Sequence, residues 1–127
     1  MRVMVVDDDP WLAGLLKQLV LSKRPGAEVD CYGDVKSAYA GWQSNKYQLI
    51  LSDWNLPDDS GLTLFQLIRK HDKETPLVMI TGRADRESVL AIRPLAISAY
   101  ITKPFDVPKV LECLESLLPA DNTTVAH

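Results

Sequence analysis

The chain has 127 residues, a net charge of −3 and two cysteines, which fits one mildly acidic domain. With 46% hydrophobic and 24% charged residues, its composition is globular and excludes a disordered or fibrous chain. The acidic balance argues against direct binding of nucleic acid or an anionic membrane. The N-terminus shows neither a signal peptide nor a membrane span, so we expect a soluble, cytoplasmic protein in which Cys31 and Cys113 are buried thiols.

Short apolar runs alternate with helical patterns along the chain. The runs predict strands at Val3–Val6, Glu28–Tyr32, Gln48–Ser52, Leu77–Ile80 and Ala99–Thr102. Apolar residues at helical spacing predict a helix after each strand: after Asp9, after Asp34, at about Leu62–His71, at Asp85–Arg93 and after Asp106. We expect Asp9, Asp34 and Asp106 to cap their helices. We expect the fourth helix to be short or broken, because Pro94 cannot continue it.

This alternation predicts an α/β fold, since short strands joined through helices must run parallel with right-handed crossovers. We expect a doubly wound five-stranded parallel sheet of the flavodoxin-like order 2-1-3-4-5, with five flanking helices and the second strand at an edge. The domain should span residues 1–118. From 119 to 127 the chain is polar and patternless, which indicates a tail or the start of a linker to an effector domain.

Polar side chains stand where four of the five predicted strands end. Asp7 and Asp8 follow the first strand, Asp53 the third, Thr81 the fourth and Lys103 the fifth. Ligands bind at the carboxyl edge of such sheets, so these residues should converge there. Three neighbouring carboxylates repel one another unless a cation lies among them, and their oxygens suit Mg²⁺.

This arrangement fits transfer of a phosphoryl group to a carboxylate. Asp53, at the centre, would be the nucleophile that forms an aspartyl phosphate. The hydroxyl of Thr81, the charge of Lys103 and Mg²⁺ would together stabilise the phosphoryl oxygens, because this reaction needs mostly positioning and neutralisation.

Four ordered motifs resemble the receiver domain of two-component response regulators, over residues 1 to about 118. They read Val-Val-Asp7-Asp8-Asp9-Pro, Leu-Ser-Asp53-Trp-Asn-Leu-Pro57 with Gly61, Ile-Thr81-Gly82 and Tyr100-Ile-Thr-Lys103-Pro104-Phe105. The resemblance implies that Mg²⁺ is bound by Asp8, Asp53 and the backbone carbonyl of Asn55, with Asp7 acting through water. It also implies a cis peptide bond between Lys103 and Pro104.

The resemblance further implies how such a domain works. A histidine kinase or a histidine phosphotransfer protein would donate the phosphoryl group, and the domain would catalyse only its own phosphorylation and dephosphorylation. Phosphorylation would draw Thr81 towards the phosphate and turn Tyr100 inward. The surface of the fourth helix, fifth strand and fifth helix would then change and act as the output, towards a C-terminal effector domain or in a homodimer.

Two other functions compete with this interpretation. An aspartate-nucleophile phosphatase of the haloacid dehalogenase type is disfavoured, because it needs an acid/base aspartate where Asn55 stands. A pseudo-receiver that only binds proteins is disfavoured because every acceptor-site residue is present. Two residues keep open alternatives: Tyr100 is a switch or a packing aromatic, and Arg83 is a phosphate contact or an exposed loop residue.

Overall fold

The computed structural model describes residues 1–82 and 85–120. Its single sheet has five parallel strands in the order β2-β1-β3-β4-β5, which confirms the predicted doubly wound α/β fold. The strands are β1 (Arg2–Val6), β2 (Glu28–Tyr32), β3 (Leu49–Asp53), β4 (Leu77–Thr81) and β5 (Ala99–Thr102). Their parallel pairing puts all five carboxyl ends at one edge of the sheet.

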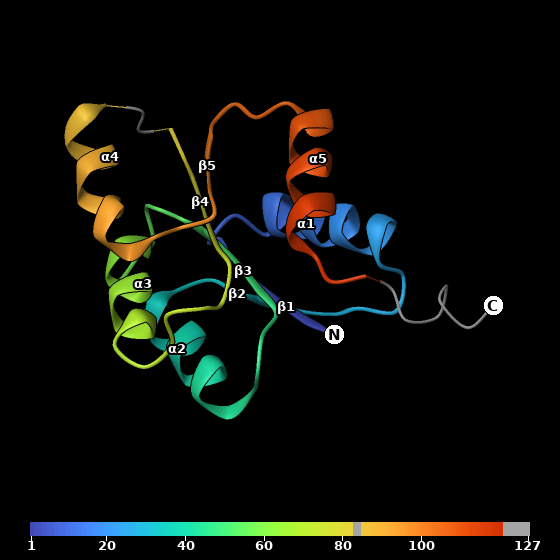
Figure 1. The fold of residues 1–127 in the computed structure, drawn as a ribbon, viewed down its shortest axis with the longest axis horizontal. Helices are drawn as coiled ribbons and strands as arrows, with labels where there is room; N and C mark the ends of the chain where they lie inside the picture. The colour runs from blue at the N-terminus through green and yellow to red at the C-terminus, as the bar shows by residue number, and fades with distance from the viewer. Residues whose placement is uncertain (83–84, 121–127) are drawn as a thin grey trace.

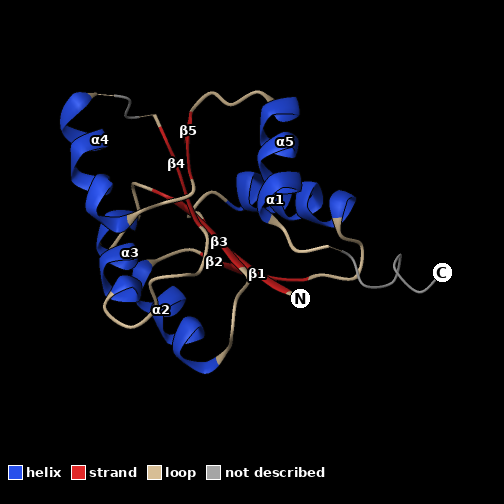
Figure 2. Ribbon diagram, viewed as in Figure 1, coloured by secondary structure: helices blue, strands red, loops and turns tan. Residues whose placement is uncertain are grey.

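Five α-helices connect and follow the strands (Figure 2). They are α1 (Pro10–Lys23), α2 (Val35–Ser44), α3 (Gly61–Arg69), α4 (Arg86–Ile92) and α5 (Val107–Leu117). The expectation of a short fourth helix is confirmed, because α4 ends at Ile92 and Pro94 lies in a 3₁₀ turn, η1 (Arg93–Leu95). Ala96 then takes a left-handed conformation with φ of 50°, which turns the chain towards β5 without a glycine.

Helices cover both faces of the sheet (Figure 1). Alternate residues of each strand point to opposite faces, so Val3 and Val5 pack with α1 and α5, while Met4 and Val6 pack with α2, α3 and η1. The interior strands β3 and β4 are buried along their whole length, whereas the edge strand β2 is only partly covered. The two apolar layers hold the strand ends in fixed register, which positions the candidate site.

Side chains cap most of the helices, as the sequence indicates. Asp9 accepts hydrogen bonds from the backbone N–H groups of Trp11 and Leu12, and Asp34 accepts one from Ser37. Asp106 stands at the N-cap of α5 but makes no side-chain capping hydrogen bond, so that expectation is wrong. Pro108 lies in the first turn of α5 and has no N–H to offer a cap.

The cysteine prediction is also wrong, because Cys31 is exposed and Cys113 only half-buried. Cys31 lies on β2, and an edge strand has fewer neighbours to cover its side chains. Both cysteines are free thiols. In the part of the chain that the structure describes, no helix has the length and apolar character needed to cross a membrane. Residues 121–127 of the predicted tail, and Arg83, lie outside the described residues.

Candidate functional site

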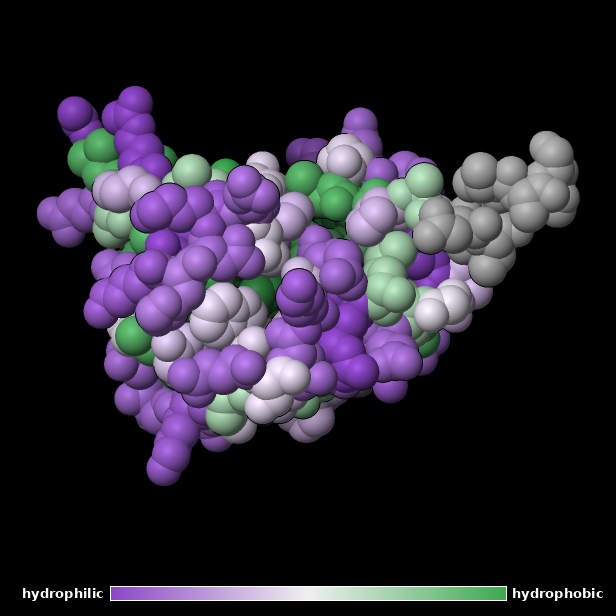
Figure 3. All heavy atoms as spheres, turned by 60° about the horizontal axis from the view of Figure 1, so that its bottom comes forward, coloured by the Kyte–Doolittle hydropathy of each residue, from purple (hydrophilic) through white to green (hydrophobic). Residues whose placement is uncertain are grey.

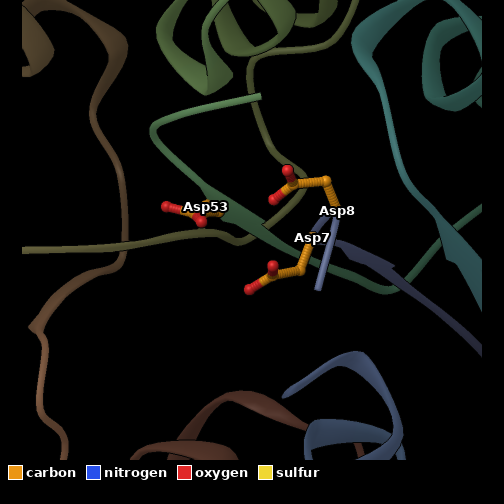
Figure 4. Close-up of side chains that lie close together, drawn as sticks. All are labelled: Asp7, Asp8 and Asp53. Carbon is orange, nitrogen blue, oxygen red and sulfur yellow. The ribbon is translucent and has the colours of Figure 1, made fainter. Parts of the chain in front are cut away.

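Three carboxylates gather at the carboxyl edge of the sheet. One oxygen from each of Asp7, Asp8 and Asp53 lies within 4.8 Å of the others. Figure 4 shows the three side chains directed to the same side of the chain. Asp7 follows β1 and is 5% exposed, Asp53 is the last residue of β3 and is 8% exposed, and Asp8 is open to solvent. The predicted convergence of the acidic residues is confirmed.

Lys103, which directly follows β5, joins this cluster. Its Nζ donates a hydrogen bond of 3.0 Å to Oδ2 of Asp53 and lies 3.5 Å from Oδ2 of Asp7. The backbone of Lys103 is held in turn, because its N–H donates to the carbonyl of Thr81 at 2.8 Å. The peptide bond to Pro104 is cis, as the sequence motif implied. The four residues Asp7, Asp8, Asp53 and Lys103 form what we call the acidic pocket.

The charges in the acidic pocket are out of balance. Burial raises the pKa of Asp7, and the neighbouring charge of Asp53 raises it further. Burial lowers the pKa of Lys103, but the hydrogen bond to Asp53 and the charge of Asp7 outweigh that effect, so its pKa is raised. The acidic pocket holds one ammonium group and three carboxylates, and its possible metal-ligating atoms are all oxygens. This composition fits a hard divalent cation.

The loop between β3 and α3 closes tightly beside the acceptor strand. The N–H of Asn55 donates to Oδ1 of Asp53 at 3.3 Å, and Asn55 also pairs with Ser60 in an isolated bridge. The N–H of Gly61 donates to the carbonyl of Trp54 at 2.8 Å. A Cβ on Gly61 would lie 2.2 Å from the carbonyl oxygen of Asp53, so only glycine allows this approach. The loop therefore holds Asn55 against Asp53.

The two predicted switch residues lie on neighbouring strands. Thr81 is completely buried at the end of β4, where it pairs with Thr102 of β5. Tyr100 is half-buried on β5 and packs against the core on the side of α2, α3 and η1. Their part in a switch, and metal binding by the Asn55 carbonyl, stay predictions.

Two residues beside the site were not singled out from the sequence. The hydroxyl of Ser52 is buried and donates to the carbonyl of Asp53 at 2.9 Å. Asp58 reaches from the β3–α3 loop to the backbone of α2. Neither has a local sequence signal, because Ser52 reads as an ordinary strand residue and Asp58 as a turn residue.

A separate surface groove lies at the amino edge of the sheet. Trp42, Tyr47 and His71 help to line it, and it contains none of the predicted site residues. Figure 3 shows the molecule turned by 60° so that the bottom of Figure 1 comes forward, and this face is largely hydrophilic with small apolar patches. Since none of Asp7, Asp8, Asp53 and Lys103 lines the groove, it is separate from the acidic pocket.

Comparison with known proteins gives matches over nearly the whole chain. Residues 3–115 match the family model of the response regulator receiver domain. The transcriptional regulatory protein RprY of Bacteroides fragilis is 30% identical over 118 residues, which are 93% of this chain and 49% of RprY. The chemotaxis protein CheY of Pseudomonas aeruginosa is 26% identical over 126 residues, 96% of this chain and 99% of CheY. The chain thus spans about half of RprY but nearly all of CheY.

Solved structures share the fold. A CheY-like response regulator receiver domain protein from Methanospirillum hungatei has a TM-score of 0.83 at 28% identity, covering 91% of this chain and 90% of that one. The response regulator TrrA from Thermotoga maritima, solved in complex with Mg²⁺ and BeF, has a TM-score of 0.80 at 30% identity, with 92% and 98% of the two chains covered.

Proposed function

Since the chain belongs to the response regulator receiver domains of two-component signalling, and the acidic pocket is its phosphoacceptor site, we propose that Asp53 takes the phosphoryl group. The contact of Asp53 with Lys103, in the same cluster as Asp7 and Asp8, carries this proposal. A phosphoryl group on Asp53 would therefore have both the lysine and the metal-binding carboxylates as neighbours. Asp8 has no such contact with Lys103 among the described ion pairs.

The transfer is a displacement at phosphorus. A carboxylate oxygen of Asp53 attacks the phosphorus of a phosphohistidine whose other ring nitrogen is protonated, the bond from phosphorus to the imidazole nitrogen breaks, and neutral imidazole leaves. Lys103, already 3.0 Å from the acceptor oxygen, pairs with the negative charge that arrives. Thr81 donates its hydroxyl to a phosphoryl oxygen. In dephosphorylation, water attacks the phosphorus, the bond to Asp53 breaks and inorganic phosphate leaves. The domain thus catalyses only its own phosphorylation and dephosphorylation.

The cation in this proposal is Mg²⁺, held by Asp8, Asp53 and the backbone carbonyl of Asn55, with Asp7 acting through water. When bound, it would offset the negative charge of the phosphoryl group. The excess of carboxylates over ammonium groups in the acidic pocket supports this assignment. So does TrrA, a relative of the same fold that was solved with Mg²⁺ and BeF.

A receiver domain implies a histidine kinase as its partner. We propose that the phosphoryl group comes from such a kinase, directly or through a histidine phosphotransfer protein, in the cytoplasm. The output would leave through α4, β5 and α5, with Tyr100 turning inward, towards an effector domain or a second copy. The exposed side chains of Val89 and Leu90 on α4 support this surface, because they offer a partner apolar contacts. The receiver unit would be residues 1–118, since α5 ends at Leu117.

Intact-mass spectrometry after treatment with acetyl phosphate tests the acceptor. Wild type should gain one phosphoryl mass with Mg²⁺ and none with EDTA, and Asp53→Asn should gain none. Ser52→Ala serves as a control beside the acceptor and should still gain the mass. Equal uptake by Asp53→Asn would contradict the assignment. No uptake by wild type would instead indicate a pseudo-receiver, and steady release of phosphate from many substrates would indicate a phosphatase.

A further inference from the structure

Asp58 joins two elements that are distant in the sequence. It stands at the tip of the β3–α3 loop, and its side chain reaches the first turn of α2. Oδ1 accepts a hydrogen bond of 2.9 Å from the N–H of Val35, and Oδ2 accepts one of 3.0 Å from the N–H of Lys36. The first contact spans 23 residues. One carboxylate thus binds two successive backbone groups of another element.

Helix α2 already has a cap of its own. The side chain of Asp34 accepts from the N–H of Ser37 at 2.7 Å, and the carbonyl of Asp34 accepts from Ala38. The two remaining donors in the first turn, on Val35 and Lys36, are the ones that Asp58 takes. The contact satisfies these two donors of α2 and at the same time fixes the loop that carries Asp58.

The loop has few other attachments near its tip. Leu56 donates to the carbonyl of Asp59 at 3.3 Å, and the Asn55–Ser60 bridge and the hydrogen bond from Gly61 to Trp54 close its base. All of these contacts lie within the loop and its ends. Leu56 packs against the apolar core that includes α2, and Asp58 is the loop residue whose side chain has described hydrogen bonds to α2. Because these contacts close the loop tightly, a displacement of Asp58 would also displace the backbone of Asn55, three residues earlier.

The exposed carboxylate of Asp58 is ionised at neutral pH, and its hydrogen bonds lower its pKa further. The N–H of Val35 lowers its pKa most; desolvation opposes this effect, but the N–H groups of Lys36, Asp58 and Asp59 lower the pKa further, so the net shift is downwards. The positive end of the α2 dipole favours the same state. The contact is thus charge-assisted at both oxygens.

We propose that Asp58 is a positioning residue for the metal site: by clamping the β3–α3 loop to α2, it holds the backbone of Asn55 beside Asp53. The inference rests on the proposed function, since it assigns the Asn55 carbonyl to Mg²⁺. Asp58 does not touch the ion. The loss of the Asp58 side chain removes no metal ligand, but it allows the loop that carries Asn55 to move.

The test compares Asp58→Ala with Asp59→Ala in the full chain. Asp59 is the adjacent carboxylate, and its side chain contacts only Ser60 and Thr63 within its own loop and helix. Both variants lose one negative charge and two hydrogen bonds near the site, but only Asp58→Ala removes the contact with α2. Isothermal titration with Mg²⁺ alone should show a dissociation constant raised about tenfold in Asp58→Ala, the low end of effects of supporting residues on metal affinity. Asp59→Ala should stay within about twofold, since its charge is screened and the contact of the loop with α2 is kept.

Amide hydrogen exchange gives a readout without metal. In Asp58→Ala the amides of Val35 and Lys36 should exchange faster, while that of Ser37, held by Asp34, should not change. Asp58→Asn keeps one strong acceptor and should fall between alanine and wild type. If Asp58→Ala binds Mg²⁺ within twofold of wild type, the inference is overturned and the proposed function stands. A wild type that binds no Mg²⁺ overturns both.

Discussion

At the amino end of the sheet the guanidinium of Arg2 lies 2.6 Å from Glu28 and 2.8 Å from Asp30, whereas at the carboxyl end a single lysine faces three carboxylates. Tyr47 completes the amino-end network, because its hydroxyl donates to Asp30 at 2.6 Å. Each end therefore has one cation in contact with two carboxylates, but the carboxyl end holds a third carboxylate, Asp8, that has no ion pair among the described residues.

The pKa values follow this difference. Burial raises the pKa of Asp30, but the hydroxyl of Tyr47 and the guanidinium of Arg2 outweigh it, so the pKa is lowered. Burial raises the pKa of Asp7, and its contact with Lys103 does not reverse the shift. In the folded protein, the amino end thus stabilises the ionised form of Asp30, whereas the carboxyl end destabilises the ionised form of Asp7. We infer that the excess negative charge at the carboxyl end favours a bound cation.

The largest expected effect comes from breaking the geometry of the carboxyl end. Gly61→Ala places a Cβ 2.2 Å from the carbonyl oxygen of Asp53 and 2.9 Å from Oγ of Ser52, so the backbone must shift. We expect a loss of about 3 kcal/mol in the free energy of unfolding, measured by urea denaturation at pH 7.

Gly14→Ala is the matched control, since a Cβ at Gly14, inside α1, meets nothing within 4 Å. It should stabilise the protein by about 1 kcal/mol through helix propensity. Equal stability of Gly61→Ala and wild type would show that the loop accommodates a side chain.

A smaller loss should follow from unpairing the amino end. Asp30→Asn keeps the shape but loses the charge that Arg2 and Tyr47 bind, and we expect a loss of about 1 to 2 kcal/mol at pH 7. The folded-state pKa of Asp30 is lowered, so its contribution is present above the unfolded pKa of about 4 and is lost as the pH falls through the folded pKa. Urea denaturation from pH 7 down to pH 2.5 should therefore bring the two proteins together in acid.

Glu28→Gln provides the comparison for this variant. The side chain of Glu28 is 67% exposed, so its ion pair with Arg2 is screened and should contribute less than about 1 kcal/mol. An Asp30→Asn protein as stable as wild type at pH 7 would contradict the contrast between the two ends of the sheet.

The smallest effect should have the opposite sign. The folded-state pKa of Asp7 is raised, so its contribution to stability is present below the unfolded pKa and is lost as the pH rises through the folded pKa. At pH 7 without metal, Asp7→Asn should therefore stabilise the protein by on the order of 1 kcal/mol. Urea denaturation in EDTA measures this gain.

Added Mg²⁺ should reverse the order of these two proteins. Wild type gains stability by binding the ion, by about 1.4 kcal/mol at ten times the dissociation constant, and Asp7→Asn should gain less. An Asp7→Asn protein that is less stable than wild type in EDTA would show that Lys103 already neutralises the acidic pocket.

Much of this architecture follows from local sequence patterns. Short apolar runs and helical spacing predict the elements, and the crossover rule then brings Asp7, Asp53 and Lys103 to one edge, as the structure shows. Pro94 predicts the short α4 because proline acts within its own turn.

The errors concern features that depend on distant residues. The sequence predicts a buried Cys31, but that depends on what covers an edge strand. It predicts a helix to His71, whereas α3 ends at Arg69, whose guanidinium donates to the carbonyl of Leu95. The contact of Asp58 with α2 has no local signal at all, since its partners lie 23 and 22 residues away.

No contiguous segment of the chain contains the acidic pocket alone, because the ends of the three strands β1, β3 and β5 supply its residues. A fragment that ends before β5, or one that begins after β1, lacks a member of the acidic pocket. Stable phosphoryl uptake thus requires the sheet to be assembled from both ends of the chain. The mass gained by a population therefore counts its intact, folded molecules, and the same reaction that carries a signal also serves as an assay of folding.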